Sequence, residues 1–389
     1  MTDPTGASAA AAGSGPLTGV RVLELAGLAP GPFAATLLSD LGAEVVRIDR
    51  PPPPATEGEP PSDPLGRGRR SVSLDLKHAD GPATLLRLAT KADVLLEGFR
   101  PGVCERLGIG PDRCLAANPR LVYARLTGYG QDGPWAGHAG HDIDYLALSG
   151  ALAAIGPATT PPVPPVNFLA DFGGGGMLAV VGVLAALFER ERSGRGQVVD
   201  AAMTEGVALF TTFVRGLRAT GAWSGPRGTN VLDGGAPFYR TYACADGRFV
   251  AVGAIEPEFY AVLVERLGLT DLPPQWDRAA WGDVAERFAA VFASRPRDAW
   301  AELFDDPQAC VAPVLELDEA PDHPQARTRR AYVDVGGQRL PAPAPRLSRT
   351  PGAIQGPPPT PGRDTARVLS DWGFTTSEIT RLRCGGALG

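Results

Sequence analysis

Paired cysteines, an excess of positive charge and a long apolar run are all missing from this chain of 389 residues. The five cysteines lie far apart, without the spacings of disulfide-rich domains or zinc sites, so neither is expected. A formal net charge of −6 gives no reason to expect binding to nucleic acid or to an acidic membrane. The first 15 residues lack the basic start and apolar centre of a signal peptide.

The longest apolar run, from Met177 to Phe188, is also too short to cross a bilayer. It ends in four charged residues, which favours a buried helix over a membrane span. These features predict a cytoplasmic globular protein with neither a membrane nor a nucleic acid as partner.

Strand and helix patterns alternate along the first part of the chain. Residues 20–25 and 43–49 read as strands, and residues 33–41 between them have the apolar spacing of a helix that stops at Gly42. Such a β-α-β opening belongs to a parallel sheet covered by helices. The pattern continues with strands expected at 71–76, 93–97 and 121–126 and a helix at 81–90, which predicts a doubly wound α/β domain.

The second half of the chain has a different composition. Long helices are expected at 176–192 and 197–220, and after Gly221 a smaller α+β domain follows. Its expected elements are a strand at 249–254 and helices at 257–267, 281–293 and 298–304. The last seventy residues are rich in Pro and Arg, with one helix near 376–383, so they are expected to wrap over the existing domains.

Two segments carry the residues expected to do chemistry. Gly140 is followed by His141, Asp142 and Asp144, an imidazole and two carboxylates within four residues. Asp171 stands before four glycines and an apolar helix. A His and an Asp that face one site from separate elements suit proton transfer by two bases. The alternatives are a structural His and an ordinary helix N-cap at Asp171.

Arginines follow the expected strands, where ligands of open α/β sheets bind. Arg50 and Arg100 directly follow two strands, Arg106 lies slightly further on, and guanidinium groups pair well with phosphate. As a set they predict a site for a phosphorylated nucleotide, although for any one of them alone a surface ion pair is the better explanation. NAD is not favoured, because the GxGxxG fingerprint is absent. A metal site is not favoured either, because His138 and His141 lack a third ligand at a recognisable spacing.

Together these segments resemble the class III CoA-transferase (CaiB–BaiF) family and, within it, the branch of α-methylacyl-CoA racemases. The resemblance runs from Pro16 to about Arg349, and no single motif carries it. The matching segments are Leu41–Asp49, Leu74–Lys77, Gly98–Gly102, Gly140–Ile143, Asp171–Gly175, Gln197–Met203 and Gly253–Pro257.

The resemblance implies a Rossmann-like large domain, a smaller domain and a homodimer of two interlocked chains. Each active site would lie between the large domain of one chain and the small domain of the other. CoA would lie on the large domain near Arg50, Arg100, Arg106 and Gly140. The implied division is a disordered tail at 1–15, the first part of the large domain at 16–200, a linker helix at 201–229, the small domain at 230–316, and a return segment at 317–389 that completes the large domain.

The resemblance also implies roles for individual residues. His141 and Asp171 would be the two bases of a 1,1-proton transfer through an enolate, and Glu256 would support His141. The substrate would be a 2-methylacyl-CoA thioester, its CoA belonging to the substrate, with no metal or redox cofactor. Asp144 replaces the familiar Asn of this motif, and a charge there beside the imidazole would raise the pKa of His141.

Two other functions stay open. In a CoA-transferase of the same family, Asp171 would attack the thioester and carry the acyl group. A catalytically idle CoA-binding scaffold is the other alternative. The presence of both His141 and Glu256 favours the racemase.

Overall fold

A computed structural model describes residues 14–51 and 63–389, and the chain divides into two compact units. Unit 1 consists of Met1–Ser149, Val166–Leu209 and Arg327–Gly389, and unit 2 of Gly150–Pro165 and Phe210–Ala326. Nearly all of the expected disordered tail at 1–15, and most of the Pro-rich loop at 51–64, lie outside the described residues.

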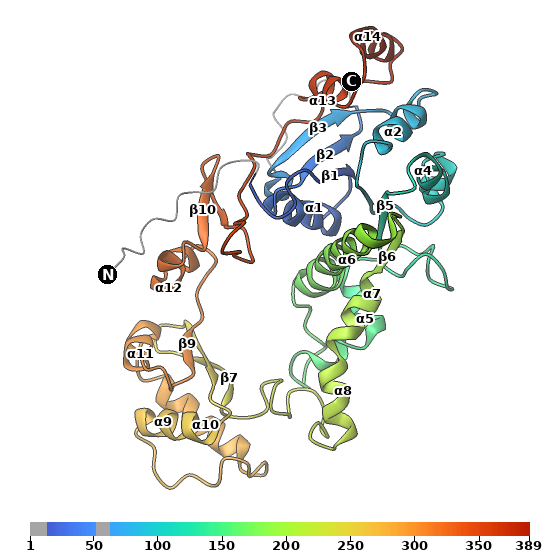
Figure 1. Cartoon of the computed structure of the whole chain (residues 1–389). Coiled ribbons are helices and arrows are strands. Elements are labelled where there is room, and N and C mark those ends of the chain that lie inside the picture. Colours follow the sequence, from blue (N-terminus) through green and yellow to red (C-terminus); the bar gives the residue numbers. More distant parts are fainter. Residues whose placement is uncertain (1–13, 52–62) are drawn as a thin grey trace. The chain divides into compact units, whose positions relative to one another are not determined.

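The core of unit 1 is a parallel sheet with the strand order β3-β2-β1-β4-β5-β6 (Figure 1). This is the order of the doubly wound dinucleotide-binding folds, so the predicted α/β class is confirmed. Buried Val, Leu and Ile fill the central strands because helices cover both faces. The strands are β1 (Arg21–Leu25), β2 (Glu44–Asp49), β3 (Arg69–Ser73), β4 (Val94–Glu97), β5 (Val122–Thr127) and β6 (Val198–Ala202).

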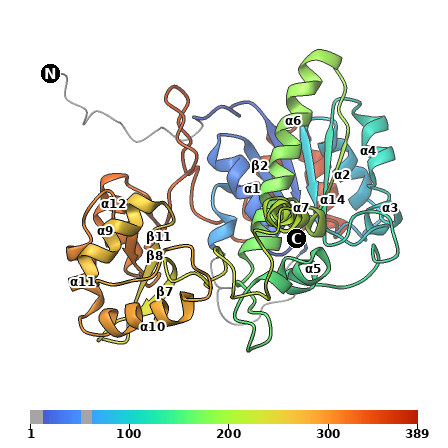
Figure 2. The same ribbon diagram turned by 90° about the horizontal axis from the view of Figure 1, so that it is seen from below.

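Helices pack on both faces of this sheet. Figure 2 shows α1 and α6 on one face and α2 and α4 on the other, in agreement with their contacts to the strands. The hairpin of β10 (Tyr332–Val335) and β11 (Gln338–Pro341) also belongs to unit 1. The helical elements are α1 (Pro30–Asp40), η1 (Pro64–Gly66), α2 (Gly81–Ala89), α3 (Val103–Arg106), α4 (Pro111–Ala117), α5 (Asp142–Ser149), η3 (Phe168–Met177), α6 (Leu178–Ser193), α7 (Met203–Phe210), α13 (Thr365–Asp371) and α14 (Thr376–Cys384).

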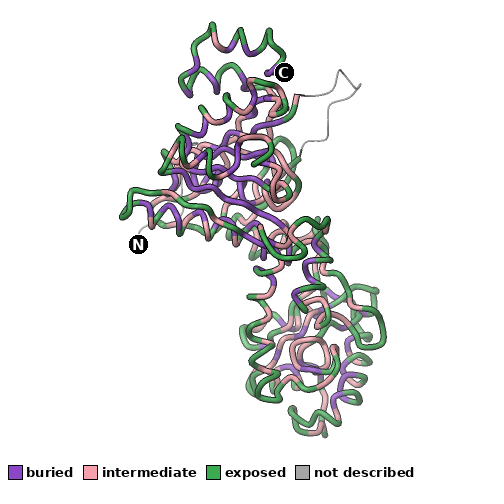
Figure 3. The backbone as a smooth tube through the Cα atoms, turned by 90° about the vertical axis from the view of Figure 1, so that its right-hand side faces the viewer, coloured by how far each residue is buried: buried purple, intermediate pink, exposed green. Residues whose placement is uncertain are grey.

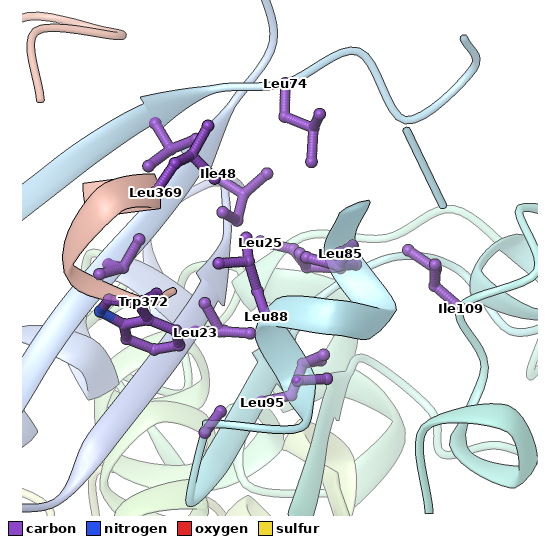
Figure 4. Packing of buried hydrophobic residues seen from close by; sticks show 14 of the residues in the cluster. Leu23, Leu25, Ile48, Leu74, Leu85, Leu88, Leu95, Ile109, Leu369 and Trp372 are labelled. Carbon is purple, nitrogen blue, oxygen red and sulfur yellow. The ribbon is translucent and has the colours of Figure 1, made fainter. Parts of the chain in front are cut away.

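The C-terminal segment completes the hydrophobic core of unit 1. Leu369 and Trp372 pack with Leu23 and Ile48 of the central strands and with Leu88 of α2 (Figure 4). The helix predicted near 376–383 is α14, whereas α13, directly before it, was not predicted.

Unit 2 is a small α+β unit. Its strands β7, β8 and β9 form an antiparallel sheet, and Phe238, Phe288, Phe292 and Trp300 are buried against it. Figure 3 shows that the buried residues gather inside each unit separately. The elements are η2 (Leu152–Ala154), α8 (Thr212–Ala219), β7 (Tyr239–Ala243), β8 (Phe249–Gly253), α9 (Pro257–Leu267), α10 (Trp281–Phe292), α11 (Arg297–Leu303), β9 (Val311–Pro313), η4 (Ala320–Asp322) and α12 (Pro324–Thr328, at the junction with unit 1).

The predictions of one long helix at 197–220 and of a single linker helix at 201–229 were both wrong. Residues 198–202 form the edge strand β6, followed by two separate helices, α7 and α8. The residues of β6 are mostly Val and Ala, which fit either an edge strand or a helix, and pairing with β5 decides between them.

The apolar helix also begins earlier than predicted. It starts at Phe168 with a π-helical stretch, η3, and continues as α6 to Ser193. At 26 residues, with a mean hydropathy of 1.7 in its most apolar window, it is long and apolar enough to span a bilayer. Core helices meet the same criterion, and this helix packs against β5 and β6.

Candidate active site

A cavity of about 1460 Å³ opens at the carboxyl ends of β1, β2, β4 and β5 in unit 1. The chain turns in opposite directions from β1 and β4, which are neighbours in the sheet, so their loops separate and leave a crevice. The floor includes Glu24 and Glu97, buried carboxylates that pair with Arg69 and Arg125 at 2.7 and 3.0 Å.

Most of the predicted site residues line this one cavity. Arg50, Arg100, Gly140, His141 and Asp171 all belong to its wall, although they come from four separate segments of the sequence.

Two of the predicted site residues are placed elsewhere. Among the described residues, Arg106 is exposed at the end of α3 and is not part of the lining. Glu256 belongs to unit 2, so its predicted support of His141 stays a prediction.

His141 lies at the entrance to α5. Its backbone N–H donates to Asp144 Oδ2 at 2.9 Å, and its carbonyl accepts from the N–H of Asp144 at 2.9 Å. Asp144 therefore caps the helix, and the hydrogen bond of its carboxylate goes to the backbone of His141. This leaves the imidazole exposed at the cavity wall.

Gly140 is required by two tyrosines that the sequence analysis did not single out. A Cβ at this position would lie 2.5 Å from the hydroxyl of Tyr129 and 2.8 Å from the ring of Tyr145. The Tyr145 hydroxyl donates to the carbonyl of Gly140 at 2.5 Å. Burial raises the pKa of Tyr145 to about 12, so the hydroxyl keeps its proton and remains a donor.

Asp171 lies inside the first turn of η3. The N-cap position, which was an alternative for Asp171 from the sequence, is occupied by Asn167. The carboxylate of Asp171 is half-buried, and Oδ2 accepts from Nδ2 of Asn167 at 3.2 Å. Burial raises the pKa of Asp171 above its usual value; the Asn167 bond and His141 oppose this shift, and the charge of Asp142 adds to it. Asn167 was missed from sequence, although its position one turn earlier was a usable signal.

The helix that carries Asp171 is capped from outside. Asp142 Oδ2 accepts from the backbone N–H groups of Ala170 and Asp171, at 2.8 and 2.9 Å. These two N–H groups at the start of the helix are therefore already engaged.

The glycines after Asp171 let other parts of the protein approach the helix backbone closely. A Cβ on Gly174 would lie 2.8 Å from the backbone N of Val207 in α7, and one on Gly176 would lie 2.6 Å from the ring of Phe33 in α1. Helices α1 and α7 therefore hold η3 by nearly direct backbone contact, which fixes Asp171 at the cavity wall.

The charged residues at the ends of the strands differ in their availability. Asp49 at the end of β2 is buried, and its two oxygens accept from Arg47 at 3.0 Å and from Ser71 at 2.6 Å. Arg50 and Arg100 are exposed at the cavity, as a phosphate site requires.

Comparison with known proteins gives a consistent result. The chain matches the family model "CoA-transferase family III" over residues 17–365. It is 50% identical to the mouse (Mus musculus) "Alpha-methylacyl-CoA racemase", with 94% of this chain and 96% of the mouse protein covered. It is 47% identical to the human (Homo sapiens) protein of the same name over the same shares of each chain.

More distant relatives and solved structures agree. The "Succinyl-CoA--L-malate CoA-transferase beta subunit" of Chloroflexus aurantiacus is 32% identical, with 95% of this chain and 97% of that protein covered. The crystal structure of a CAIB/BAIF family protein from Brucella suis superposes with a TM-score of 0.78 at 25% identity, covering 92% of this chain and 100% of that one. The resemblance seen in the sequence is confirmed, and the chain belongs to CoA-transferase family III.

Proposed function

We propose that this protein epimerises 2-methylacyl-CoA thioesters by moving the α-proton from one face of the carbon to the other. The observation that carries the proposal is that His141 and Asp171, from separate elements, line one cavity. The relatives at 50% and 47% identity, both named alpha-methylacyl-CoA racemases, support the same reaction.

The proposed chemistry is a proton transfer that conserves all atoms. One base removes the weakly acidic α-proton, the thioester becomes an enolate, and the conjugate acid of the other base returns a proton to the opposite face. A carboxyl group with a raised pKa, such as that of Asp171, gains and loses protons more readily near neutral pH. The first N–H groups of α5, next to His141, have no acceptor within the helix and are candidate donors to the enolate oxygen.

Substrate binding follows from the charges at the cavity. We propose that Arg50 and Arg100 bind phosphates of CoA, with Arg106 further out and Gly140 beside the thioester. CoA enters and leaves as part of the substrate. Because the transfer exchanges one proton for another, it is redox-neutral, and we propose that no metal or redox cofactor takes part.

We further propose that the protein works as an interlocked homodimer in the cytoplasm, without a membrane or nucleic acid as partner. The apolar helix of unit 1 exposes Phe168, Met177, Val181 and Phe188, and a second copy is the proposed cover. In that dimer, Glu256 of one chain would lie near His141 of the other. The free cysteines, two of them exposed, suit a reducing compartment.

A CoA-transferase remains the second candidate, favoured by the named CoA-transferase among the relatives. In that reaction Asp171 attacks the thioester and carries the acyl group, so the same half-buried carboxylate serves both mechanisms.

The deciding experiment incubates the purified protein with one enantiomer of a straight-chain 2-methylacyl-CoA in D₂O, without an acceptor acid. We expect deuterium at the α-carbon together with conversion toward both epimers, followed by NMR and chiral analysis. His141→Ala and Asp171→Ala should each abolish the inversion. Absence of exchange, with CoA transfer once a free acid is supplied and a hydroxylamine-sensitive acyl group on Asp171, would instead establish the transferase.

The proposed dimer can be tested by complementation. His141→Ala and Glu256→Ala chains should each be inactive alone. Co-expressed, they should recover about one quarter of the parent activity, because half of the dimers are mixed and each mixed dimer has one intact site. If His141 and Glu256 of one site came from the same chain, no activity would return. The racemase activity of the co-expressed mixture, compared with that of each single variant, therefore decides whether the site is shared between two chains.

A further inference from the structure

One buried side chain connects the two segments that carry His141 and Asp171. Asp142 follows His141 directly in the chain, and its Oδ2 accepts from the backbone N–H groups of Ala170 and Asp171. Both bonds are short, at 2.8 and 2.9 Å, and the Asp142 side chain is buried, with 6% of the residue exposed. It is not part of the cavity lining among the described residues, so it reaches the site only through its neighbours.

An ordinary helix cap would not need this connection. The local N-cap of η3 is Asn167, which forms no side-chain cap bond and donates its amide to the Asp171 carboxylate instead. Asp142 takes over the capping from another element, 28 residues away in sequence. Its second oxygen, Oδ1, is buried without a hydrogen-bond partner in the described residues. A carboxylate in this state is a costly cap, because a buried unpaired oxygen loses its bonds to water.

The two hydrogen bonds of Asp142 connect the backbone beside His141 to the backbone of Asp171. Both of these positions must be fixed if the α-carbon of the substrate is to be inverted. If one base removes a proton and the other delivers one to the opposite face, both must stay within reach of a single carbon atom. A small change in their separation lets the first base return the proton to the face from which it came. Exchange of the α-proton would then continue without inversion.

We propose that Asp142 is a positioning residue that fixes the separation of His141 and Asp171, and thereby directs the proton to the opposite face. This inference rests on the proposed racemase function. It assigns to Asp142 the partition between exchange with inversion and exchange with retention, and not the binding of substrate.

The test measures that partition in D₂O with one enantiomer of a straight-chain 2-methylacyl-CoA. Mass spectrometry gives total α-deuteration, and chiral separation gives the share that has inverted. Asp142→Ala removes both bonds, so inversion should fall roughly 10- to 100-fold, as expected for misplacement of a catalytic group. Total exchange should fall much less, and KM should stay near the parent value.

Two conservative variants separate length from charge. Asp142→Asn keeps the length and an acceptor oxygen, so its inverted share should be close to that of the parent. Asp142→Glu keeps the charge but lengthens the side chain by one methylene, and its inverted share should fall. These two keep the test decisive if Asp142→Ala does not fold. Normal partition in Asp142→Glu together with a reduced one in Asp142→Asn would overturn the proposal.

Thr375→Ala is the matched control for the loss of a helix cap. Thr375 caps α14 by accepting from the N–H of Glu378 at 3.3 Å and is not among the cavity-lining residues. Its loss should lower thermal stability without changing the inverted share. A parallel fall of inversion and exchange in Asp142→Ala would also contradict the proposal, whereas a parent protein without any exchange would refute the racemase function itself.

Discussion

At the scale of single residues, three aspartates within or next to the cavity have different roles. Asp144 binds the backbone N–H of His141 and caps α5. Asp142 binds the backbone of η3. Only Asp171 lines the cavity, half-buried and with a raised pKa. Their different surroundings, and not their side-chain chemistry, separate structural from candidate catalytic carboxylates.

The raised pKa of Asp171 makes stability depend on pH. Below the ordinary carboxyl pKa of about 3.9 the group is neutral in both the folded and unfolded chain. As pH rises through the raised pKa, the folded chain ionises a group that water would solvate better, so this contribution to stability is lost. Asp171→Asn removes the ionisation, and its free energy of unfolding should exceed that of the parent by an amount that grows as the pH rises above about 4 and levels off above the raised pKa.

Chemical denaturation at a series of pH values measures this difference. Asp132→Asn is the control, because Asp132 is an exposed residue of the loop before Gly140. This control measures how far the loss of an exposed carboxylate alone changes stability across the same pH series. A flat difference for Asp171→Asn would show that ionisation of Asp171 has no cost in the folded chain.

At the scale of elements, the crossing of η3 and α7 holds the site together. Gly206 of α7 lies against the backbone of η3, where a Cβ would come within 1.9 Å of the carbonyl oxygen of Gly174. No side chain can move aside there, because both partners are backbone. The crossing therefore requires glycine on each helix.

Gly206→Ala should destabilise the protein by about 1–3 kcal/mol, the usual cost of overpacking. It should also lower the racemase activity, because η3 carries Asp171. Gly216→Ala in α8 is the matched control: a Cβ there meets nothing within 4 Å, and alanine favours a helix by roughly 0.5–1 kcal/mol. Thermal unfolding of both variants shows whether each substitution lowers or raises stability. Equal stabilisation by the two substitutions would contradict the close backbone contact between η3 and α7.

The elements themselves were largely predictable, and the exceptions have physical causes. The two strands and the helix of the β-α-β opening follow from apolar spacing alone. The strand β6 was hidden because its pairing with β5 comes from residues 75 positions earlier, beyond any local pattern. The π-helical stretch η3, with which the apolar helix begins, packs closely against α1 and α7. No local sequence pattern contains these contacts.

At the scale of the whole molecule, the C-terminal segment belongs to the same unit as the N-terminal sheet. Trp372 is almost fully buried, its indole N–H donates to Glu44 Oε1 at 3.1 Å, and the guanidinium of Arg21 lies 5.2 Å from its ring centroid. Trp372, the C-cap residue of α13, thus contacts the first residues of the neighbouring strands β1 and β2.

Trp372→Ala should cost about 3–5 kcal/mol of stability, as for other fully buried aromatic residues. Trp276→Ala is the control, because Trp276 is half-exposed in unit 2 and its edge-to-face contact with Phe238 is worth only about 0.5–1.5 kcal/mol. Denaturant unfolding of both variants gives the comparison. Equal losses would mean that the C-terminal segment adds little to the core.

Only part of the candidate site could be predicted from the sequence. The sequence placed His141 and Asp171 together through a family resemblance, and both do line one cavity. Asn167, Tyr145 and the Asp142 bonds were not foreseen, because each depends on where the backbone of a distant segment lies.

The arrangement of unit 1 sets a constraint on how the protein is made. A ribosome releases the six strands of the sheet, which end at Ala202, long before the residues around Leu369 and Trp372 that close one face of its core. Until then Leu23, Ile48 and their neighbours lack their final cover. The newly made chain therefore presents an apolar surface while the intervening residues are made, and the core of unit 1 closes only after Leu369 and Trp372 have emerged.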